Sequence, residues 1–300
     1  MIITTYGLQA ALAMALLLIA EGLWCCWKKL GYGVWIRQSV LTIPLAFLMS
    51  RVLFSLFAIG NGDFSSPVQA LYFWDGGASI TGAFIGAVIA AALTEKACGV
   101  SGGVLLDGVG IGAPLAIMLE RLCEPGVELG IGRIVDTEFL AFLGAATDDR
   151  HPVYLYCAVA AVLILLALLH DVARKDGKRR NGDVLLTFMT FYGCVQVILE
   201  SLRDDAHMVI YFIRINQIAG LVMAVIAFVI WTVRWVRSGA KGLHVTISCV
   251  VLIAAIAQGV VQEFAVDSNP NLLLEYAIMA ACLAVVAAVT LFVRSRAERA

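Results

Sequence analysis

Apolar residues occur along this chain in runs of about 20, a length sufficient for a helix to cross a hydrocarbon core about 30 Å thick. The alternation of apolar and polar positions that is typical of barrel strands is absent. Because backbone groups in lipid need internal hydrogen-bond partners, we expect helical spans. The pattern predicts nine spans, approximately at 5–24, 34–58, 77–95, 104–122, 152–171, 183–202, 215–236, 243–262 and 272–293.

The composition agrees with this pattern. Hydrophobic residues make up 61% of the 300 positions and charged residues only 14%, with a mean hydropathy of +0.92. No large water-soluble domain fits between the predicted spans. The first run has no basic region before it and no small-residue cleavage site after it, so we expect it to be retained as a span. The predicted fold is all-α, a polytopic helical bundle embedded in a membrane.

The distribution of positive charge predicts the orientation of the bundle. Of the 21 Lys and Arg residues, 15 are in loops that alternate along the chain and would therefore share one side of the membrane. The positive-inside rule makes that side cytoplasmic, with the N-terminus outside and the C-terminus inside. These 15 residues are Lys28, Lys29, Arg37, Lys96, Arg174, Lys175, Lys178, Arg179, Arg180, Arg234, Arg237, Lys241, Arg294, Arg296 and Arg299.

Other function classes receive little support from the sequence. The eight cysteines show no CxxC or Cys/His metal spacing, so we expect no disulfide, no metal and no cofactor. A phosphate-binding GxxxxGK[ST] loop is absent, which argues against nucleotide use. The net charge of −1 by itself argues neither for nor against nucleic acid, and for a membrane-embedded chain we expect no such partner.

The positive residues outside the cytoplasmic set are all arginines. Arginine presents a planar fork of donors suited to phosphate and carboxylate, which indicates specific pairing. The alternative is that outer loops avoid lysine for other reasons. The six residues are Arg51, Arg121, Arg133, Arg150, Arg203 and Arg214.

A polar stripe is predicted in the outer half of the sixth span. At about 100° per residue, Tyr192, Gln196, Glu200 and Arg203 share one helix face. An ionisable residue inside a membrane is costly and normally faces a bundle interior or a cavity. Glu200 and Arg203 can also simply pair with each other at i,i+3 spacing and close the helix end, and the sequence leaves both readings open.

Two further clusters fall on the same predicted side. The stretch "LERLCEPGVELGIG", 119–132, carries Arg121, Glu124 and Glu128 next to helix-breaking residues. The stretch "DGGASITGAFIG", 75–86, is rich in glycine at the start of the third span, which permits close backbone or headgroup approach, although tight helix packing explains its GxxxG pair equally well. Three polar clusters on one side predict a site for an anionic headgroup such as a lipid phosphate.

At these positions the sequence resembles the prolipoprotein diacylglyceryl transferase family. The likeness covers approximately residues 1–237, with its motifs in the family's order. "YGCVQVILESLRDD" resembles YGxxRxxxExxR, "HPVYLY" resembles HPxQLYE from His151, "TYGLQ" matches a tyrosine–glycine pair at Tyr6, "SRVLF" places an arginine at Arg51, "GGASITGAFIG" resembles GGxxxHGGxxG, and "ERLCEPGVELGIG" resembles GRIGNFxNGExxG.

The chain departs from these motifs at several positions. Thr81 stands where the family has the histidine of HGG, Gln196 replaces the arginine of YGxxR, and Glu124 replaces the asparagine of RIGN. HPxQLYE ends here in Cys157. The resemblance predicts a seven-helix core at 1–237 and an additional two-helix extension at 238–300.

The resemblance implies transfer of a diacylglyceryl group from phosphatidylglycerol to the lipobox cysteine of a prolipoprotein in the bacterial inner membrane. The phospholipid and the prolipoprotein signal peptide are the implied partners. Arg121 and Arg203 would hold the phosphate with support from Arg51, Glu128 or Glu200 would orient an arginine or act as base, and Tyr6 and Tyr192 would donate hydrogen bonds. The implied catalytic set is Arg121, Glu128, Glu200 and Tyr192, and the implied binding set is Tyr6, Arg51, Arg203, Gly77, Thr81, Gln196, Glu124 and His151.

Two other functions remain open from the sequence. Thr81 and Gln196 also fit a catalytically impaired descendant that binds anionic phospholipid or lipoprotein signal peptides without turnover. A small transporter or channel would need a polar path across the bilayer, but apart from Glu21 and Asp107 the inner halves of the spans carry almost no charge.

Overall fold

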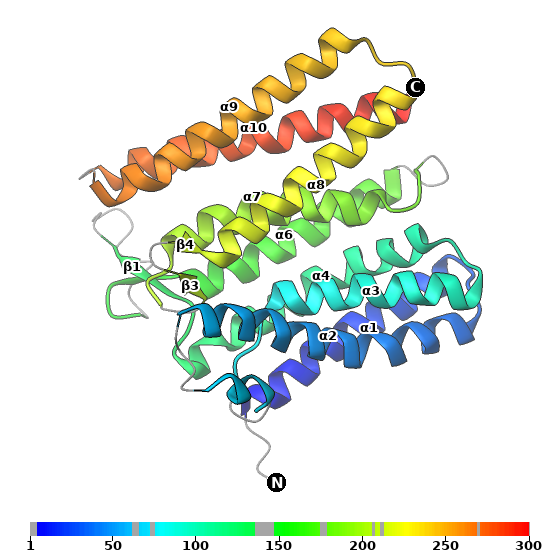
Figure 1. Ribbon diagram of the computed structural model, residues 1–300, viewed down its shortest axis with the longest axis horizontal. Helices are drawn as coiled ribbons and strands as arrows, with labels where there is room; N and C mark the ends of the chain where they lie inside the picture. The colour runs from blue at the N-terminus through cyan, green and yellow to red at the C-terminus, as the bar shows by residue number, and fades with distance from the viewer. Residues whose placement is uncertain are drawn as a thin grey trace. The chain divides into compact units, whose positions relative to one another are not determined.

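The chain folds into long helices joined by short connections (Figure 1). Within the part of the chain that the structure describes, nine helices are long and apolar enough to cross a membrane, which confirms the predicted spans and fold class. The helices are α1 Thr5–Trp27, α2 Tyr32–Asn61, α3 Ile80–Cys98, α4 Gly102–Cys123, α6 Val153–Arg174, α7 Asp183–Leu202, α8 Ile215–Arg237, α9 Gly242–Ser268 and α10 Leu272–Arg299. The computed structural model describes residues 5–61, 66–72, 76–135, 147–174, 179–205, 208–210, 213–268 and 271–299.

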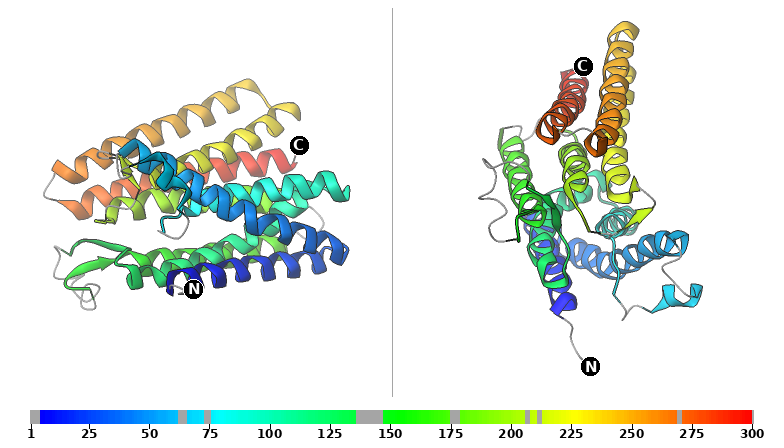
Figure 2. Two further views of the ribbon diagram at one scale, coloured as in Figure 1. Left: turned by 60° about the horizontal axis from the view of Figure 1, so that its bottom comes forward. Right: turned by 90° about the vertical axis from the view of Figure 1, so that its left-hand side faces the viewer.

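The chain forms two compact units. The first consists of Met1–Asp176, Asn181–Leu185 and Arg203–Ile215, and the second of Gly177–Arg180, Leu186–Leu202 and Asn216–Ala300. In the first unit α1 packs on α4, α2 packs on α3, and α4 also packs on α6. Figures 1 and 2 show these helices running side by side.

Close packing of α2 on α3 depends on the glycines of the GxxxG pair. A Cβ atom at Gly82 would lie 2.4 Å from the carbonyl oxygen of Met49, and one at Gly86 would lie 2.3 Å from that of Leu45. Only glycine allows the two backbones to approach this closely. Tight packing, the simpler of the two explanations of these glycines, is therefore confirmed.

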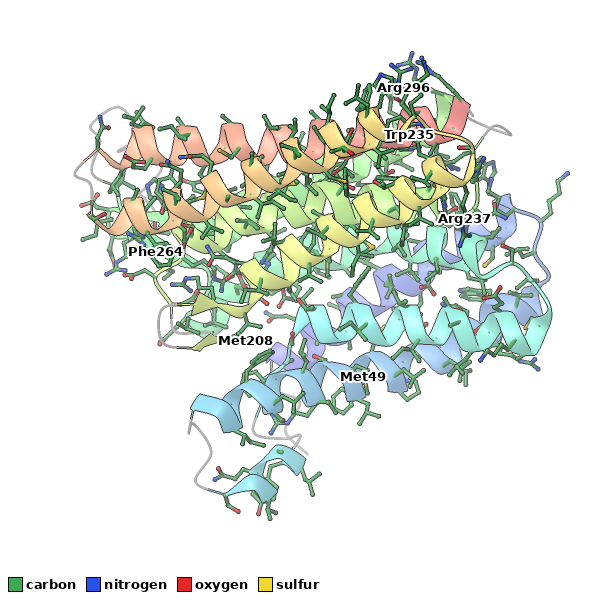
Figure 3. The ribbon with its side chains drawn as sticks, turned by 45° about the horizontal axis from the view of Figure 1, so that its top comes forward. Met49, Met208, Trp235, Arg237, Phe264 and Arg296 are labelled. Carbon is green, nitrogen blue, oxygen red and sulfur yellow. The ribbon has the colours of Figure 1, made fainter. Side chains whose placement is uncertain are left out.

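In the second unit α7 and α8 meet at a glycine pair, and α9 and α10 form a hairpin (Figure 2). A Cβ atom at Gly193 would lie 2.3 Å from the carbonyl oxygen of Gly220. Trp235 of α8 and Phe292 of α10 meet edge to face with ring centroids 6.1 Å apart. Figure 3 shows Arg237 and Arg296 at one end of this unit, the end at which α8 and α10 finish.

Two short strand pairs complete the first unit, and the sequence pattern did not predict them. β1 Ile131–Ile134 pairs antiparallel with β2 Arg150–Pro152, and β3 Val209–Ile210 pairs antiparallel with β4 Ile213–Arg214. Two 3₁₀ turns, Pro67–Leu71 and Glu124–Val127, lie before α3 and after α4.

The start of the third span differs from its prediction. The span was expected from 77, but α3 begins at Ile80. Gly76 and Gly77 adopt φ angles of 78° and 80°, which a right-handed helix does not accommodate. Ser79 then caps the helix by accepting a hydrogen bond from the Gly82 amide, 3.2 Å away. Gly77 therefore lies in the segment before the helix rather than inside the span.

Candidate functional site

Two buried arginines of the first unit meet at one carboxylate. Arg121 is in the last turn of α4, Glu124 follows the helix end, and Arg203 comes from a segment far along the chain. Their side chains are only 2%, 5% and 1% exposed. Nη1 of Arg121 donates to Oε1 of Glu124, and Nη1 of Arg203 lies 3.0 Å from the same oxygen. One oxygen atom therefore sits between two guanidinium groups.

Further contacts hold Arg203 in this position. Its Nε and Nη2 atoms lie 3.0 and 2.8 Å from Oδ2 of Asp205. Arg214 donates from Nη2 to the carbonyl oxygen of Arg203 at 2.6 Å, and the Gly130 amide donates to Asp205 at 2.9 Å. We call Arg121, Glu124, Arg203, Asp205 and Arg214 the charged cluster.

The position of Arg203 corrects the predicted helical stripe. α7 ends at Leu202, and the backbone of Arg203 forms a β-bridge with Gly132. The adjacent Asp204 amide donates to the carbonyl oxygen of Ile131 at 3.1 Å. Because these backbone contacts draw the chain into an extended conformation, Arg203 leaves the helix face and reaches Glu124 instead.

The other members of the stripe lie in the second unit. Glu200 is buried on α7, and its Oε1 atom accepts from Nε2 of Gln196 at 2.6 Å and from Nδ2 of Asn216 at 3.2 Å. We call Gln196, Glu200 and Asn216 the amide cluster. Tyr192, also buried, stacks on Phe188 with ring centroids 5.3 Å apart. A carboxylate in this unit is thus held by neutral amides.

Arg51 is engaged by backbone carbonyl groups. Its guanidinium holds the segment between α2 and α3, and the predicted support of a phosphate stays a prediction. The contacts are Nε to Ala70 at 3.1 Å, Nη2 to Gln69 and Tyr72 at 2.9 Å each, and Nη1 to Gly77 at 3.1 Å and to Gly76. Thr81, in the first turn of α3, is half-buried.

The remaining predicted site residues are more scattered. Glu128 is exposed and has a left-handed backbone with φ of 59°, directly after the 3₁₀ turn. His151 is on β2, and its Nδ1 atom lies 3.2 Å from the hydroxyl group of Tyr156. The side chain of Tyr6 lies outside the described residues. The structure therefore unites Arg121, Glu124 and Arg203, and does not bring Glu128 into their ion pairs.

Three residues of these clusters were not predicted from the sequence: Asp205, Arg214 and Asn216. Asp205 follows the motif that placed Arg203, and Arg214 was only one of the six arginines outside the cytoplasmic set. Asn216 is a polar residue in the first turn of an apolar span, a signal that generally marks a functional or pairing position. Arg214 ends β4, whose pairing with β3 the hydropathy pattern does not reveal.

A family model described as prolipoprotein diacylglyceryl transferase matches residues 1–233, more than three quarters of the chain. The chain belongs to the prolipoprotein diacylglyceryl transferase family. The resemblance identified from the motifs is thereby confirmed. The match ends in the last turns of α8, so α9 and α10 lie beyond it.

Similar bacterial proteins carry the name phosphatidylglycerol–prolipoprotein diacylglyceryl transferase. That of Bacillus velezensis is 27% identical over 240 residues, covering 73% of this chain and 85% of the relative. Those of Methylocella silvestris and Geobacter sulfurreducens are 31% and 30% identical over 141 residues, 47% of this chain and 52% and 54% of the relatives. Together with the nine apolar helices, these relatives support the predicted location in a bacterial cell membrane as a multi-pass protein.

Proposed function

We propose that this protein transfers the diacylglyceryl group of phosphatidylglycerol to the thiol of a lipobox cysteine in a prolipoprotein. A carbon–sulfur bond forms, the bond between that carbon and the phosphate oxygen breaks, and glycerol phosphate leaves. The thiol proton passes to a base. Family membership and the names of the relatives support this reaction class.

The observation that carries the proposal is the shared oxygen of the charged cluster. Arg121 and Arg203 both approach Oε1 of Glu124, which marks where an anionic oxygen is held between two guanidinium groups. A phosphate oxygen is also negatively charged, and arginine guanidinium groups pair with phosphate as they do with carboxylate. We infer that the lipid phosphate takes the place of the Glu124 carboxylate between the two arginines.

Charge development explains why buried arginines suit this step. The leaving glycerol phosphate gains negative charge as its bond to carbon breaks, and fixed cations in a site shielded from water stabilise that charge. Arg203 is already oriented by Asp205 and Arg121 by the end of α4, so neither needs to be ordered during the reaction. Loss of one such donor typically costs a factor of about 10² to 10³ in rate.

A carboxylate is the proposed acceptor of the thiol proton. Only the thiolate is strongly nucleophilic, so a base must act before or during attack. The family resemblance implies Glu128 or Glu200 for this step. Glu128 is exposed in the first unit, and Glu200 is buried in the second and held by two amides. Variants at the two positions assign the step to one of them.

We also propose that residues 1–237 form the catalytic core, with the N-terminus outside, and that α9 and α10 are an addition to it. The match to the family model over 1–233 supports this division. The orientation rests on the distribution of Lys and Arg between alternating loops.

Thioether formation tests the proposed reaction. Purified protein in membranes containing phosphatidylglycerol is incubated with a lipobox peptide, and the peptide is weighed by mass spectrometry. We expect a diacylglyceryl mass increase that is lost in Arg121→Ala and retained in Arg150→Ala, whose side chain is 39% exposed and pairs with Asp204. No mass increase from folded wild-type protein that binds the lipid would overturn the enzymatic proposal and favour a lipid-binding descendant.

A further inference from the structure

Within the second unit, α10 forms hydrogen bonds to both ends of α7. Nη1 of Arg294, in the last two turns of α10, donates to the hydroxyl oxygen of Thr187 at 2.8 Å, and Thr187 is in the first two turns of α7. The hydroxyl group of Tyr276, in the first two turns of α10, donates to the carbonyl oxygen of Ser201 near the end of α7 at 3.1 Å. The start of each helix therefore meets the end of the other, so the two helices run antiparallel.

A buried face of α10 connects these two contacts. Its buried residues recur three or four positions apart from Glu275 to Ala297, the spacing of one helix face. Arg294 is only 3% exposed and Ser201 only 2%. At 1.5 Å per residue, Thr187 and Ser201 are separated by about 21 Å of helix. The two hydrogen bonds therefore fix α7 against α10 over most of its length.

The Tyr276 contact satisfies a backbone group at the end of α7. The last four carbonyl groups of an α-helix have no donor within the helix, and the carbonyl group of Ser201 is one of them because α7 ends at Leu202. The Tyr276 hydroxyl group donates to this carbonyl and accepts from Oγ of Ser201 at 3.4 Å. Helix ends fray readily, so we expect these two bonds to keep the last turn of α7 helical.

Glu200 is in this last turn, directly before Ser201. Its contact with Gln196 requires the i,i+4 spacing of a helix, and its contact with Asn216 requires that the turn keep its place beside α8. The position of the Glu200 carboxylate therefore depends on the helix end that Tyr276 holds. Tyr276 lies beyond residues 1–233, the part of the chain that the family model matches.

We propose that Tyr276 is a positioning residue for the transfer reaction. By holding the end of α7, it keeps the Glu200 carboxylate where that group accepts the thiol proton. The α9–α10 hairpin thereby contributes to the reaction, although it lies outside the proposed catalytic core. The kinetic part of this inference rests on the proposed function, in which Glu200 is one of the two carboxylates assigned to the proton.

Steady-state kinetics with a lipobox peptide and phosphatidylglycerol tests the positioning role. Tyr276→Phe removes one hydroxyl group and keeps the ring. We expect kcat to fall about tenfold, because small displacements of a reacting group lower the rate steeply. The KM for phosphatidylglycerol should stay unchanged, since the phosphate is assigned to the charged cluster of the first unit.

Thr187→Val is the matched control. It removes the other hydrogen bond between α10 and α7, at the opposite end of α7 from Glu200. We expect a lower unfolding midpoint and a wild-type kcat. An equal fall of kcat in Thr187→Val and Tyr276→Phe would overturn the positioning role, as would a wild-type kcat in Tyr276→Phe.

Hydrogen exchange followed by mass spectrometry gives a second readout that needs no turnover. Backbone amides in the last turn of α7 exchange when that turn opens. Exchange in the segment 197–202 should be faster in Tyr276→Phe than in the wild type, and unchanged in Thr187→Val. Unchanged exchange in Tyr276→Phe would overturn the inference. If the wild-type protein transferred no lipid but Tyr276→Phe exchanged faster, the proposed function would fail while the hold of Tyr276 on α7 would stand.

Ser201→Ala provides a second variant. It removes the hydroxyl group that donates to Tyr276 and retains the carbonyl group that accepts from it. We expect kcat to fall less than in Tyr276→Phe. A loss as large as that of Tyr276→Phe would contradict the assignment of the effect to the carbonyl group at the helix end.

Discussion

The charged cluster of the first unit and the amide cluster of the second both hold a buried carboxylate, but with different partners. Glu124 lies between two guanidinium groups, whereas Glu200 accepts hydrogen bonds from two neutral amides. Removal of Glu124 from its arginines would leave two cations available to an anion. The two amides that donate to Glu200 carry no positive charge for an anion. This difference supports the proposed binding of an anion at the charged cluster rather than at the amide cluster.

The difference arises within a short stretch of sequence. Glu200 is in the last turn of α7, and Arg203 follows the end of that helix. Helical residues keep the register of Gln196 and Glu200 at i,i+4 spacing, while the β-bridge at Gly132 takes Arg203 out of that register. Because α7 ends between them, Glu200 belongs to the amide cluster and Arg203 to the charged cluster.

The largest effect is expected for Arg203→Ala. This change leaves Glu124 and Asp205 buried without their shared cation, which typically destabilises a protein by about 3–5 kcal/mol. It also removes a donor to the phosphate, and the transfer rate is expected to fall by a factor of about 10² to 10³. Thermal unfolding and the mass-spectrometric assay measure the two effects. Arg150→Ala is the matched control, and an equal loss in both variants would remove the special role of the buried arginine.

The next largest effect distinguishes the two carboxylates proposed as base. Glu200→Gln is expected to lower the transfer rate by about 10²-fold, the low end of the range for a general base. Glu128→Gln should have a smaller effect, because its side chain is exposed. Both are measured at saturating lipid. A larger loss of transfer rate in Glu128→Gln than in Glu200→Gln would make Glu128 the acceptor of the thiol proton and give Glu200 a structural role.

Glu124→Gln tests the shared oxygen directly. The variant keeps the side-chain shape but removes the negative charge that a phosphate must displace. We expect affinity for phosphatidylglycerol to rise by about tenfold, corresponding to about 1.4 kcal/mol. Titration of the lipid into detergent-solubilised protein measures this change. A lower affinity would mean that the Glu124 charge supports lipid binding rather than competing with it.

The smallest effect is expected for Gln196→Leu. Gln196→Leu removes one of the two donors to Glu200 and leaves a buried acceptor less satisfied, at a cost of about 1–3 kcal/mol. Chemical or thermal unfolding measures the loss. Gln196→Glu is a harsher comparison, because it adds a second charge beside Glu200 without a donor. A Gln196→Leu variant as stable as the wild type would show that the remaining contacts of Glu200 satisfy the carboxylate.

The membrane-spanning helices could be predicted from the sequence, because membrane insertion depends on local hydropathy. All nine predicted spans correspond to helices, although α9 continues to Ser268, beyond its predicted end at 262. The charged cluster could be predicted only in part from the sequence. Arg121, Glu124 and Arg203 were named, but the resemblance gave the role of orienting an arginine to Glu128 or Glu200. The structure pairs Arg121 with Glu124.

The missing information concerned contacts between distant parts of the chain. Arg203 meets Glu124 across 79 positions, and Arg214 of β4 donates to the carbonyl oxygen of Arg203. Helical periodicity describes neighbours within one helix and carries no information about where a chain turns after the helix ends. The near-complete burial of Glu21 was likewise not predictable, because burial depends on how the helices pack.

The most direct test of the anion site is native mass spectrometry of the purified protein released from nanodiscs with equal amounts of phosphatidylglycerol and phosphatidylcholine. The wild-type protein and Arg150→Gln should retain phosphatidylglycerol in preference, and Arg121→Gln should lose the preference. Equal retention of the two lipids by the wild type, or an unchanged preference in Arg121→Gln, would contradict the assignment of the lipid phosphate to the charged cluster.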